Sequence, residues 1–176
     1  MIFISAGHNL KDPGAVYNSR KEALEMIAFR GLITKYFDAR HHIYVADTDT
    51  ESNGEYQRRI KTNATDVIID LHLNAATNPT ATGTEVIIAN NASEKSKALA
   101  SDICATIAQT LSIKNRGVKT EAQTARGKIG IVNVPGIAVL VEICFLSNTN
   151  DMILYDKHKD SLAKAIAQLL IKYDTL

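Results

Sequence analysis

Two histidines and a glutamate stand in or beside apolar runs of this sequence, where they could bind a metal ion or carry protons. His8 follows the apolar run that opens the chain, His72 lies near the end of "DVIIDLHLNA", and Glu142 stands inside "AVLVEICFL". A carboxylate in an apolar strand loses its hydration at a large cost unless it is paired, protonated or near a metal. Taken singly, His72 is explained as a satisfied core histidine and Glu142 as a protonated or hydrogen-bonded core glutamate.

Taken together, these three residues fall at the C-terminal ends of three expected strands. In open α/β sheets, ligand sites gather outside the carboxyl ends of the strands. Two histidines with carboxylates suit zinc, whose catalytic sites use three protein ligands and keep a fourth position for water. One acid would complete the ligand set and another could act as a general base. The spacing predicts a zinc site at this edge but does not decide which acid has which role.

The elements that hold these residues alternate between strand-like and helix-like segments. Strand-like runs rich in Ile and Val, separated by amphipathic segments, predict an α/β fold with a twisted, mostly parallel mixed sheet of about five or six strands flanked by helices. We expect strands at residues 2–6, 43–47, 66–75, 84–89 and 137–146, and helices at 21–37, 55–63, 93–112 and 151–173. The polar stretch "NRGVKTEAQTARGKIGIVN" is expected to be a loop with a short strand at its end.

Composition narrows the function classes. The 176 residues suit one buried core, and with no internal repeat or linker we expect residues 1–176 to form a single domain. The net charge of +1 gives no electrostatic reason to expect nucleic-acid binding, which normally needs a clustered basic face. The sequence shows neither a signal peptide nor an apolar run of about 18 residues, so we expect synthesis in the cytoplasm and no membrane insertion. Cys104 and Cys144 form no CxxC pair, which argues against a disulfide framework or a cysteine-bound zinc.

Four blocks of the sequence resemble, in order, the motifs of the zinc-dependent N-acetylmuramoyl-L-alanine amidases of bacterial autolysins and phage endolysins. "GHNLKDPGA" is similar to the opening motif, a histidine followed by Asp-Pro-Gly-Ala, and "DLHLNAA" to the Ser/Leu-x-His-x-Asn-Ala block. "NRGVK" is similar to the Asn-Arg-Gly segment, and "PGIAVLVEICFLSN" to the closing Pro-x-x-Leu-x-Glu-x-Gly-Phe-x-Ser-Asn motif. The blocks cover nearly the whole chain, and four matches in order are far more specific than one.

The resemblance implies hydrolysis of the amide between the lactyl group of N-acetylmuramic acid and the L-alanine of the peptidoglycan stem peptide. It implies one zinc ion per chain, bound by His8, Glu22 and His72, with Glu142 as the catalytic acid and base. Glu25, one turn after Glu22, stays open as the alternative third ligand.

The implied partner is peptidoglycan, together with a holin or another release system. The protein is then expected to act on the cell wall after release or lysis. Its oligomeric state is left open.

Other polar residues have two explanations each. Asn74 either hydrogen-bonds the substrate or shapes its loop. The basic residues of the polar stretch are either contacts to stem-peptide carboxylates or a solvated basic loop; they are Arg116, Lys119, Arg126 and Lys128. Four further glutamates are expected to be loop or surface acids; they are Glu51, Glu55, Glu85 and Glu121.

The sequence departs from the family pattern at Cys144, which stands where the family usually has glycine. Residues two apart on a strand share a face, so we expect this thiol on the same side as Glu142, near the site. A cysteine nucleophile is the alternative, although His41, His42 and His158 sit in no motif of a partner base. His41 and His42 are expected to be solvated loop residues.

Two other functions compete with the amidase. One is a non-catalytic peptidoglycan-binding or regulatory module on an amidase-like fold, which the substitution at Cys144 motivates. The other is a zinc peptidase acting on other peptides, with the same metal chemistry but a different groove.

Overall fold

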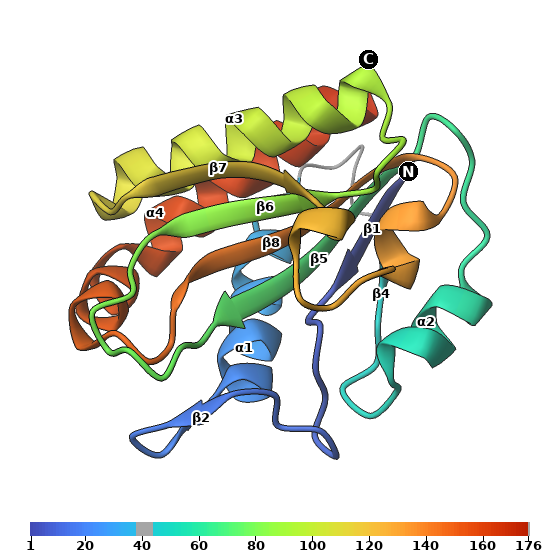
Figure 1. Ribbon diagram of the computed structural model, residues 1–176. Helices are drawn as coiled ribbons and strands as arrows, with labels where there is room; N and C mark the ends of the chain where they lie inside the picture. Colours follow the sequence, from blue (N-terminus) through green and yellow to red (C-terminus); the bar gives the residue numbers. More distant parts are fainter. Residues whose placement is uncertain (38–43, 176) are drawn as a thin grey trace.

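The computed structural model describes residues 1–37 and 44–175, which build a six-stranded sheet in the order β4-β1-β5-β8-β6-β7 (Figure 1). The strands are β1 Ile2–Ser5, β4 Tyr44–Ala46, β5 Val67–Asn74, β6 Thr84–Ile88, β7 Asn115–Thr120 and β8 Ile137–Phe145. Strands β4, β1, β5 and β8 run parallel to one another, whereas β6 is antiparallel to β8 and parallel to β7. The predicted mostly parallel mixed sheet is therefore confirmed.

The two central strands are buried on both faces. Every residue of β8 is buried, and so is every residue of β5 except Asn74. Two-sided burial explains why these segments read as continuous apolar runs, since helices or loops cover both faces of the sheet. A polar side chain within them is therefore forced into the interior, where it needs a partner.

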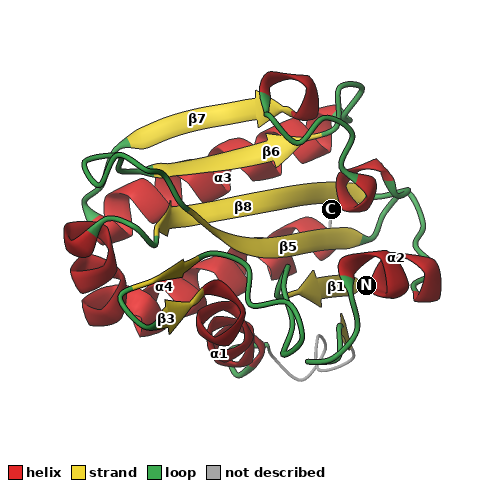
Figure 2. Ribbon diagram, turned by 60° about the horizontal axis from the view of Figure 1, so that its bottom comes forward, coloured by secondary structure: helices red, strands yellow, loops and turns green. Residues whose placement is uncertain are grey.

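The helices divide between the two faces of the sheet. α1 Glu22–Thr34, α3 Glu94–Leu111 and α4 Thr149–Asp174 pack on one face. The short α2 Asn53–Arg59 and the 3-10 helices η1 Glu121–Gln123 and η2 Gly130–Asn133 lie on the other (Figure 1). A small antiparallel hairpin, β2 Val16–Tyr17 and β3 Arg20–Lys21, leads into α1 (Figure 2). The thinly covered second face is the one that carries the polar residues of β5 and β8.

Several expected boundaries differ from the structure. The strand expected at the end of the polar stretch is instead β7 at its beginning, an edge strand with no fully buried residue, which explains its weak apolar pattern. The helix expected at 55–63 is α2, which begins after Ser52, whose side chain forms a capping box with Glu55. Ser93 caps α3 as predicted. His41 and His42 lie outside the described residues.

Helix α1 ends at Thr34, three residues before the expected end at Phe37. Within the described part of the chain, no helix is both long and apolar enough to cross a membrane.

Candidate metal centre

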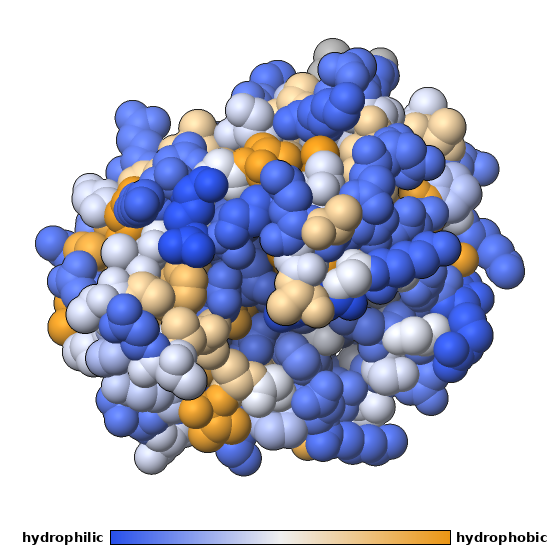
Figure 3. Space-filling view, in the orientation of Figure 1, coloured by the Kyte–Doolittle hydropathy of each residue, from blue (hydrophilic) through white to orange (hydrophobic). Residues whose placement is uncertain are grey.

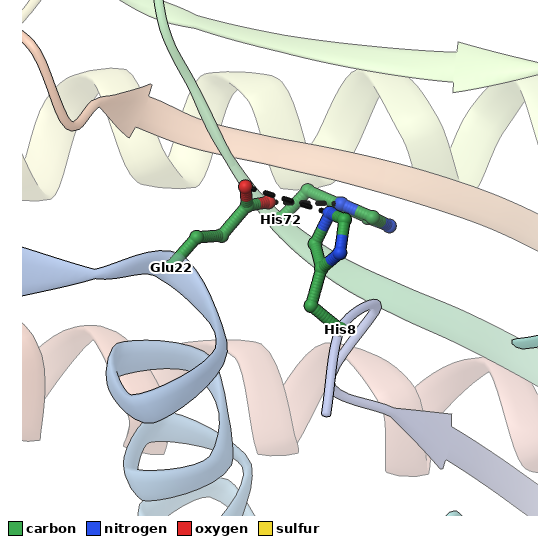
Figure 4. Close-up of side chains that lie close together, drawn as sticks. All are labelled: His8, Glu22 and His72. Atoms are coloured by element: carbon green, nitrogen blue, oxygen red, sulfur yellow. Dashed lines mark hydrogen bonds and ion pairs between the residues drawn. The ribbon is translucent and has the colours of Figure 1, made fainter. Parts of the chain in front are cut away.

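Three separate elements bring His8, Glu22 and His72 together (Figure 4). His8 lies in the loop after β1, Glu22 is the first residue of α1, and His72 points from β5. Each side chain offers one ligand atom, and these atoms all lie within 4.8 Å of one another. Residues as far apart in the sequence as His8 and His72 therefore converge, although His72 lies inside its strand and not after its end.

Two distances from the carboxylate of Glu22 to the histidines are close to those between neighbouring ligand atoms of a zinc ion. The Nδ1 atom of His72 is 3.0 Å from Oε1 of Glu22, and Nε2 of His8 is 3.5 Å from Oε2 of Glu22. Atoms bound tetrahedrally to zinc at about 2.0–2.1 Å lie roughly 3.3 Å apart. Two imidazole nitrogens and one carboxylate are also a common ligand set of catalytic zinc. The chain thus presents a three-ligand cluster, and its two histidines line a cleft.

A carboxylate holds the far nitrogen of each histidine. Nδ1 of His8 is 3.0 Å from Asp12, and Nε2 of His72 is 3.0 Å from Asp70. Such contacts fix the tautomer and orientation of a metal-binding imidazole. Asp70 is fully buried and also accepts hydrogen bonds from Ser5 and Asn53. The sequence reasoning missed Asp70, even though it stands in "VIIDLHL" as conspicuously as Glu142 stands in its own strand.

Two glycines make room for the cluster. Gly7 has φ +72°, and a Cβ there would lie 2.4 Å from Nε2 of His72. Gly14, in the Asp-Pro-Gly turn, has φ +62°, and a Cβ there would lie 2.6 Å from both Glu22 and His8. Both backbones are left-handed, which glycine adopts without strain. Any larger residue at either position would displace an expected ligand.

Charge interactions favour the ionised forms of the buried ligands. Burial lowers the pKa of His72, but the carboxylates of Asp70 and Glu22 outweigh it and raise this pKa to about 10. Burial raises the pKa of Glu22, yet its hydrogen bond and charge interaction with His72 bring the net value below the ordinary one. Without a metal, an imidazolium therefore lies between carboxylates. A metal cation would replace its proton, since only the neutral imidazole is a ligand.

Glu142 lies next to this cluster. Its Cα pairs with that of His72 across β5 and β8, and its Oε1 is 3.1 Å from the guanidinium of Arg126. Its Oε2 is buried and has no hydrogen-bond partner among the described residues. Burial raises the pKa of Glu142, only partly opposed by His72 and Arg126. A carboxyl group held in this way can take up a proton and release it again.

A β-bulge turns Cys144 away from the site. His72 pairs with Glu142 but Asn74 pairs with Phe145, so β8 contains one more residue than β5 at this point. The thiol of Cys144 consequently faces the helices and lies 3.8 Å from the sulfur of Met152 on α4. Burial raises its pKa well above the ordinary value. The prediction that this thiol lies near the site is wrong, and a buried protonated thiol has no means of acting as the nucleophile.

The alternative ligand Glu25 lies outside the cluster. Its carboxylate is 2.8 Å from Nε of Arg20 and so is already paired. Glu22 instead accepts hydrogen bonds from the backbone nitrogens of Ala15 and Leu73. The structure therefore places Glu22, and not Glu25, beside the two histidines.

Two of the glutamates expected on the surface are buried. Glu85 lies on β6 and pairs with Arg116 and Lys119, each at 2.7 Å. Glu121, in η1, accepts hydrogen bonds from the backbone nitrogen of Ile129 and from Asn133, which ties η1 to η2. The expectation of a loop or surface acid is wrong for Glu85, while Glu121 lies between strands as expected but is buried. For Glu85, the apolar context "TEVII" was the available indication.

Two clefts open on either side of the His72–Glu142 pair. One, of about 600 Å³, is bounded by the loop after β1, by α2 and by η2. The other, of about 350 Å³, lies over β6 and β7 and contains Asn74, Glu85 and Arg116. Arg126 lines both clefts, and Lys128 lines neither. The polar stretch therefore contributes to the floor of one cleft and to the boundary between the two.

Comparisons with known proteins agree on one family. The family model described as N-acetylmuramoyl-L-alanine amidase matches residues 2–172. The N-acetylmuramoyl-L-alanine amidase LytC of Bacillus subtilis is 28% identical over 178 residues, and a probable autolysin of Staphylococcus aureus is 29% identical over 197. The alignments cover 98% and 94% of this chain but only 35% and 37% of those proteins.

The fold has a close counterpart among solved structures. The crystal structure of an N-acetylmuramoyl-L-alanine amidase from Clostridium difficile 630 is 26% identical and superposes with a TM-score of 0.76. The match covers 98% of this chain and 95% of that one. The similarity thus extends over the complete sheet and its helices.

Proposed function

The chain belongs to the N-acetylmuramoyl-L-alanine amidase family, and on that premise we propose that it hydrolyses the amide joining the lactyl group of muramic acid to L-alanine in peptidoglycan. One observation carries the proposal. A zinc-type cluster of His8, Glu22 and His72 lies beside Glu142, a buried carboxyl group with one unpartnered oxygen. Metal-dependent hydrolysis of an amide by water uses a metal site together with an adjacent general acid and base.

We propose that the three clustered side chains bind one zinc ion per chain. When bound, the ion would polarise the lactyl carbonyl and make water more acidic. The protein residues set the geometry: Asp12 and Asp70 hold the far nitrogens of the two imidazoles, so that the other nitrogens face the ligand position.

Glu142 would carry the proton. It takes one proton from the attacking water as the water oxygen bonds to the lactyl carbonyl carbon. It then gives that proton to the amide nitrogen as the carbon–nitrogen bond breaks, which leaves a free L-alanine amine and a lactyl carboxylic acid. The acid keeps the second proton of the water and loses it to solvent to become a carboxylate. The raised pKa of Glu142 supports both transfers, because a general acid and base works best when its pKa approaches the working pH.

The test uses purified sacculi and the metal content of the protein. The wild type should contain about one zinc per chain and release soluble peptides, and His72→Ala should lose both properties. Peptide release by a zinc-free protein would contradict the metal mechanism. A stem peptide without the muramoyl group is the matched control substrate, and its equal cleavage would identify a general peptidase.

The alternative of a non-catalytic module was motivated by Cys144. Because Cys144 packs against α4, its substitution leaves the face of the metal cluster unaltered. The described residues keep the cluster and Glu142 together, and no feature of them favours loss of catalysis.

A further inference from the structure

We propose that the two clefts divide the substrate, so that the β6–β7 cleft binds the stem peptide through its carboxylate and the opposite cleft binds the muramic acid. The inference rests on the proposed function and adds the direction of the substrate across the site. The two halves of this substrate differ in charge, because the stem peptide carries carboxylates beyond L-alanine whereas the sugar presents neutral hydroxyl and acetamido groups. The two clefts differ in the same way.

The β6–β7 cleft contains a cation pair that one carboxylate only partly neutralises. Arg116 and Lys119 both contact the same oxygen of Glu85, each at 2.7 Å, while its other oxygen accepts a hydrogen bond from Asn74. Two cations on one carboxylate leave one positive charge in excess. Both side chains are about 30% exposed, so this excess charge is accessible from the cleft.

The cation pair is also held in a fixed place. The guanidinium of Arg116 lies 5.0 Å from the ring centre of Phe145, which the bulge in β8 turns toward this cleft. An arginine stacked on an aromatic ring keeps its N–H edge free for a carboxylate. A pre-ordered cation pays little entropy on binding, which favours a specific contact over diffuse attraction.

Arg126 adds a third cation at the boundary of the two clefts. Its side chain is 46% exposed and contacts Glu142, the expected proton carrier. The β6–β7 cleft thus contains three cations against the two carboxylates of Glu85 and Glu142. The balance favours an anionic occupant on this side of the scissile amide.

The opposite cleft also contains His8 and His72 with their carboxylate partners Asp12 and Asp70, and beyond these it presents mainly neutral polar groups. Asn9, Ser52, Asn53 and Gln57 line it, and among its described lining residues Arg126 is the only lysine or arginine, so this cleft has no excess of cations over carboxylates. Amides and hydroxyls both donate and accept hydrogen bonds, as do the hydroxyl and acetamido groups of a sugar. The larger volume, about 600 Å³ against 350 Å³, also suits a bulky pyranose ring.

The strand order separates the two clefts in space. From β5 and β8, which carry His72 and Glu142, one side of the sheet leads to β1 and β4 and the other to β6 and β7 (Figure 1). Hydrophilic residues dominate this face of the molecule (Figure 3). A muramoyl-peptide lying across the sheet would place its scissile amide at the centre and its charged end over β7.

The experiment compares two small substrates that differ at one carboxyl group: N-acetylmuramoyl-L-alanyl-D-glutamate and its D-isoglutamine counterpart, whose α-carboxyl group is a carboxamide. In both substrates the γ-carboxyl group is blocked as a methylamide, so that the α-carboxylate is the one charge by which their peptides differ. We expect kcat/KM of the wild type to be about 10- to 100-fold higher for the acid, as for a charge-assisted hydrogen bond. In Lys119→Met, which keeps the aliphatic stem, this ratio should fall toward one. Lys114→Met, an exposed cation just before β7 that lines neither cleft, should keep the wild-type ratio.

A variant in the opposite cleft tests the orientation of the substrate. Gln57→Ala, in α2, should lower kcat/KM for both substrates by the same factor and leave the ratio unchanged. If the wild type cleaved the acid and the carboxamide substrates with equal kcat/KM, this result alone would overturn the proposal. If the acid-to-carboxamide ratio of kcat/KM instead changed in Gln57→Ala and persisted in Lys119→Met, the peptide would lie in the opposite cleft, which would overturn the proposed direction of the substrate. Failure to cleave either substrate or sacculi would instead refute the proposed function.

Discussion

Two buried glutamates that are direct neighbours across β6 and β8 have opposite surroundings. Glu85 and Glu142 pair in register, and each is at most 6% exposed. Arg116, Lys119 and Asn74 all contact the carboxylate of Glu85. In the described part of the chain, the carboxyl group of Glu142 pairs with Arg126 alone and keeps one oxygen unpartnered. Burial raises the pKa of both, but its ion pairs bring the pKa of Glu85 below the ordinary value and that of Glu142 stays above it. The same residue type is thus an anchor for cations at one position and a proton carrier at the other.

The largest expected effect separates the two glutamates by activity. Glu142→Gln should lower kcat on muramoyl-peptide by about 10²- to 10⁴-fold, the usual worth of a general acid and base. Zinc content should stay at about one per chain, because Glu142 is not among the clustered ligands. Glu85→Gln should cost far less, since it only loosens Arg116 and Lys119. Rate assays measure kcat of both variants, and metal analysis measures their zinc content. A similar loss of kcat in Glu142→Gln and Glu85→Gln would contradict the different roles assigned to the two glutamates.

The second effect concerns a carboxylate that is fully partnered in the same way as Glu85. Asp70→Asn should weaken zinc binding by about 10- to 100-fold, because the amide no longer fixes the tautomer of His72 as the carboxylate does. Asp12→Asn is the matched control beside His8, and its effect should be smaller because Asp12 is 63% exposed. Chelator competition measures both affinities. Unchanged affinity in Asp70→Asn would show that the contact does not orient the ligand.

The third effect concerns stability, which should fall on substitution of Glu85 but not on substitution of Glu142. Glu85→Gln removes the partner of two cations and should lower the free energy of unfolding by roughly 1–2 kcal/mol. Glu142→Gln removes a poorly satisfied buried carboxyl group, so stability should stay equal or rise by up to about 1 kcal/mol. Urea unfolding of the metal-free proteins compares them. A larger loss in Glu142→Gln than in Glu85→Gln would contradict the account.

The smallest effect is the pH dependence of that stability difference. The lowered pKa of Glu85 stabilises the fold above the ordinary glutamate pKa, and this contribution is lost as the pH falls through the lowered value. The raised pKa of Glu142 acts in the opposite direction, so its contribution declines as the pH rises from the ordinary value through the raised one. The difference in free energy of unfolding between wild type and Glu85→Gln, plotted against pH, should therefore slope in the opposite direction to the same difference for Glu142→Gln. The same slope for both variants would show that the pKa values of Glu85 and Glu142 are shifted in the same direction.

Much of the fold was predictable because buried strands and amphipathic helices leave strong periodic patterns. The cluster residues were predictable because four motif blocks occur in order. In addition, burying a polar side chain within an apolar run costs free energy unless the side chain has a partner. Applied evenly, the same reasoning would also have singled out Asp70 in "VIIDLHL" and Glu85 in "TEVII". The expected route to the cell wall, through a holin, another release system or lysis, stays a prediction.

Other features depend on contacts that no local pattern encodes. The face on which Cys144 lies is set by a bulge in the register between β5 and β8, which alternation along one strand does not reveal. The pairing of Arg126 with Glu142 joins a loop to a strand and depends on how that loop folds back over the sheet.

The central claim is that this site cleaves the lactyl amide, and mass spectrometry of sacculus digests tests it most directly. The account predicts new ends of two kinds: stem peptides with a free L-alanine amine, and glycan strands whose muramic acid carries a free lactyl carboxylate. With Glu142→Gln, both kinds of end should form at least about 100-fold more slowly. New ends inside the stem peptide or between sugars, with the lactyl amide intact, would contradict it.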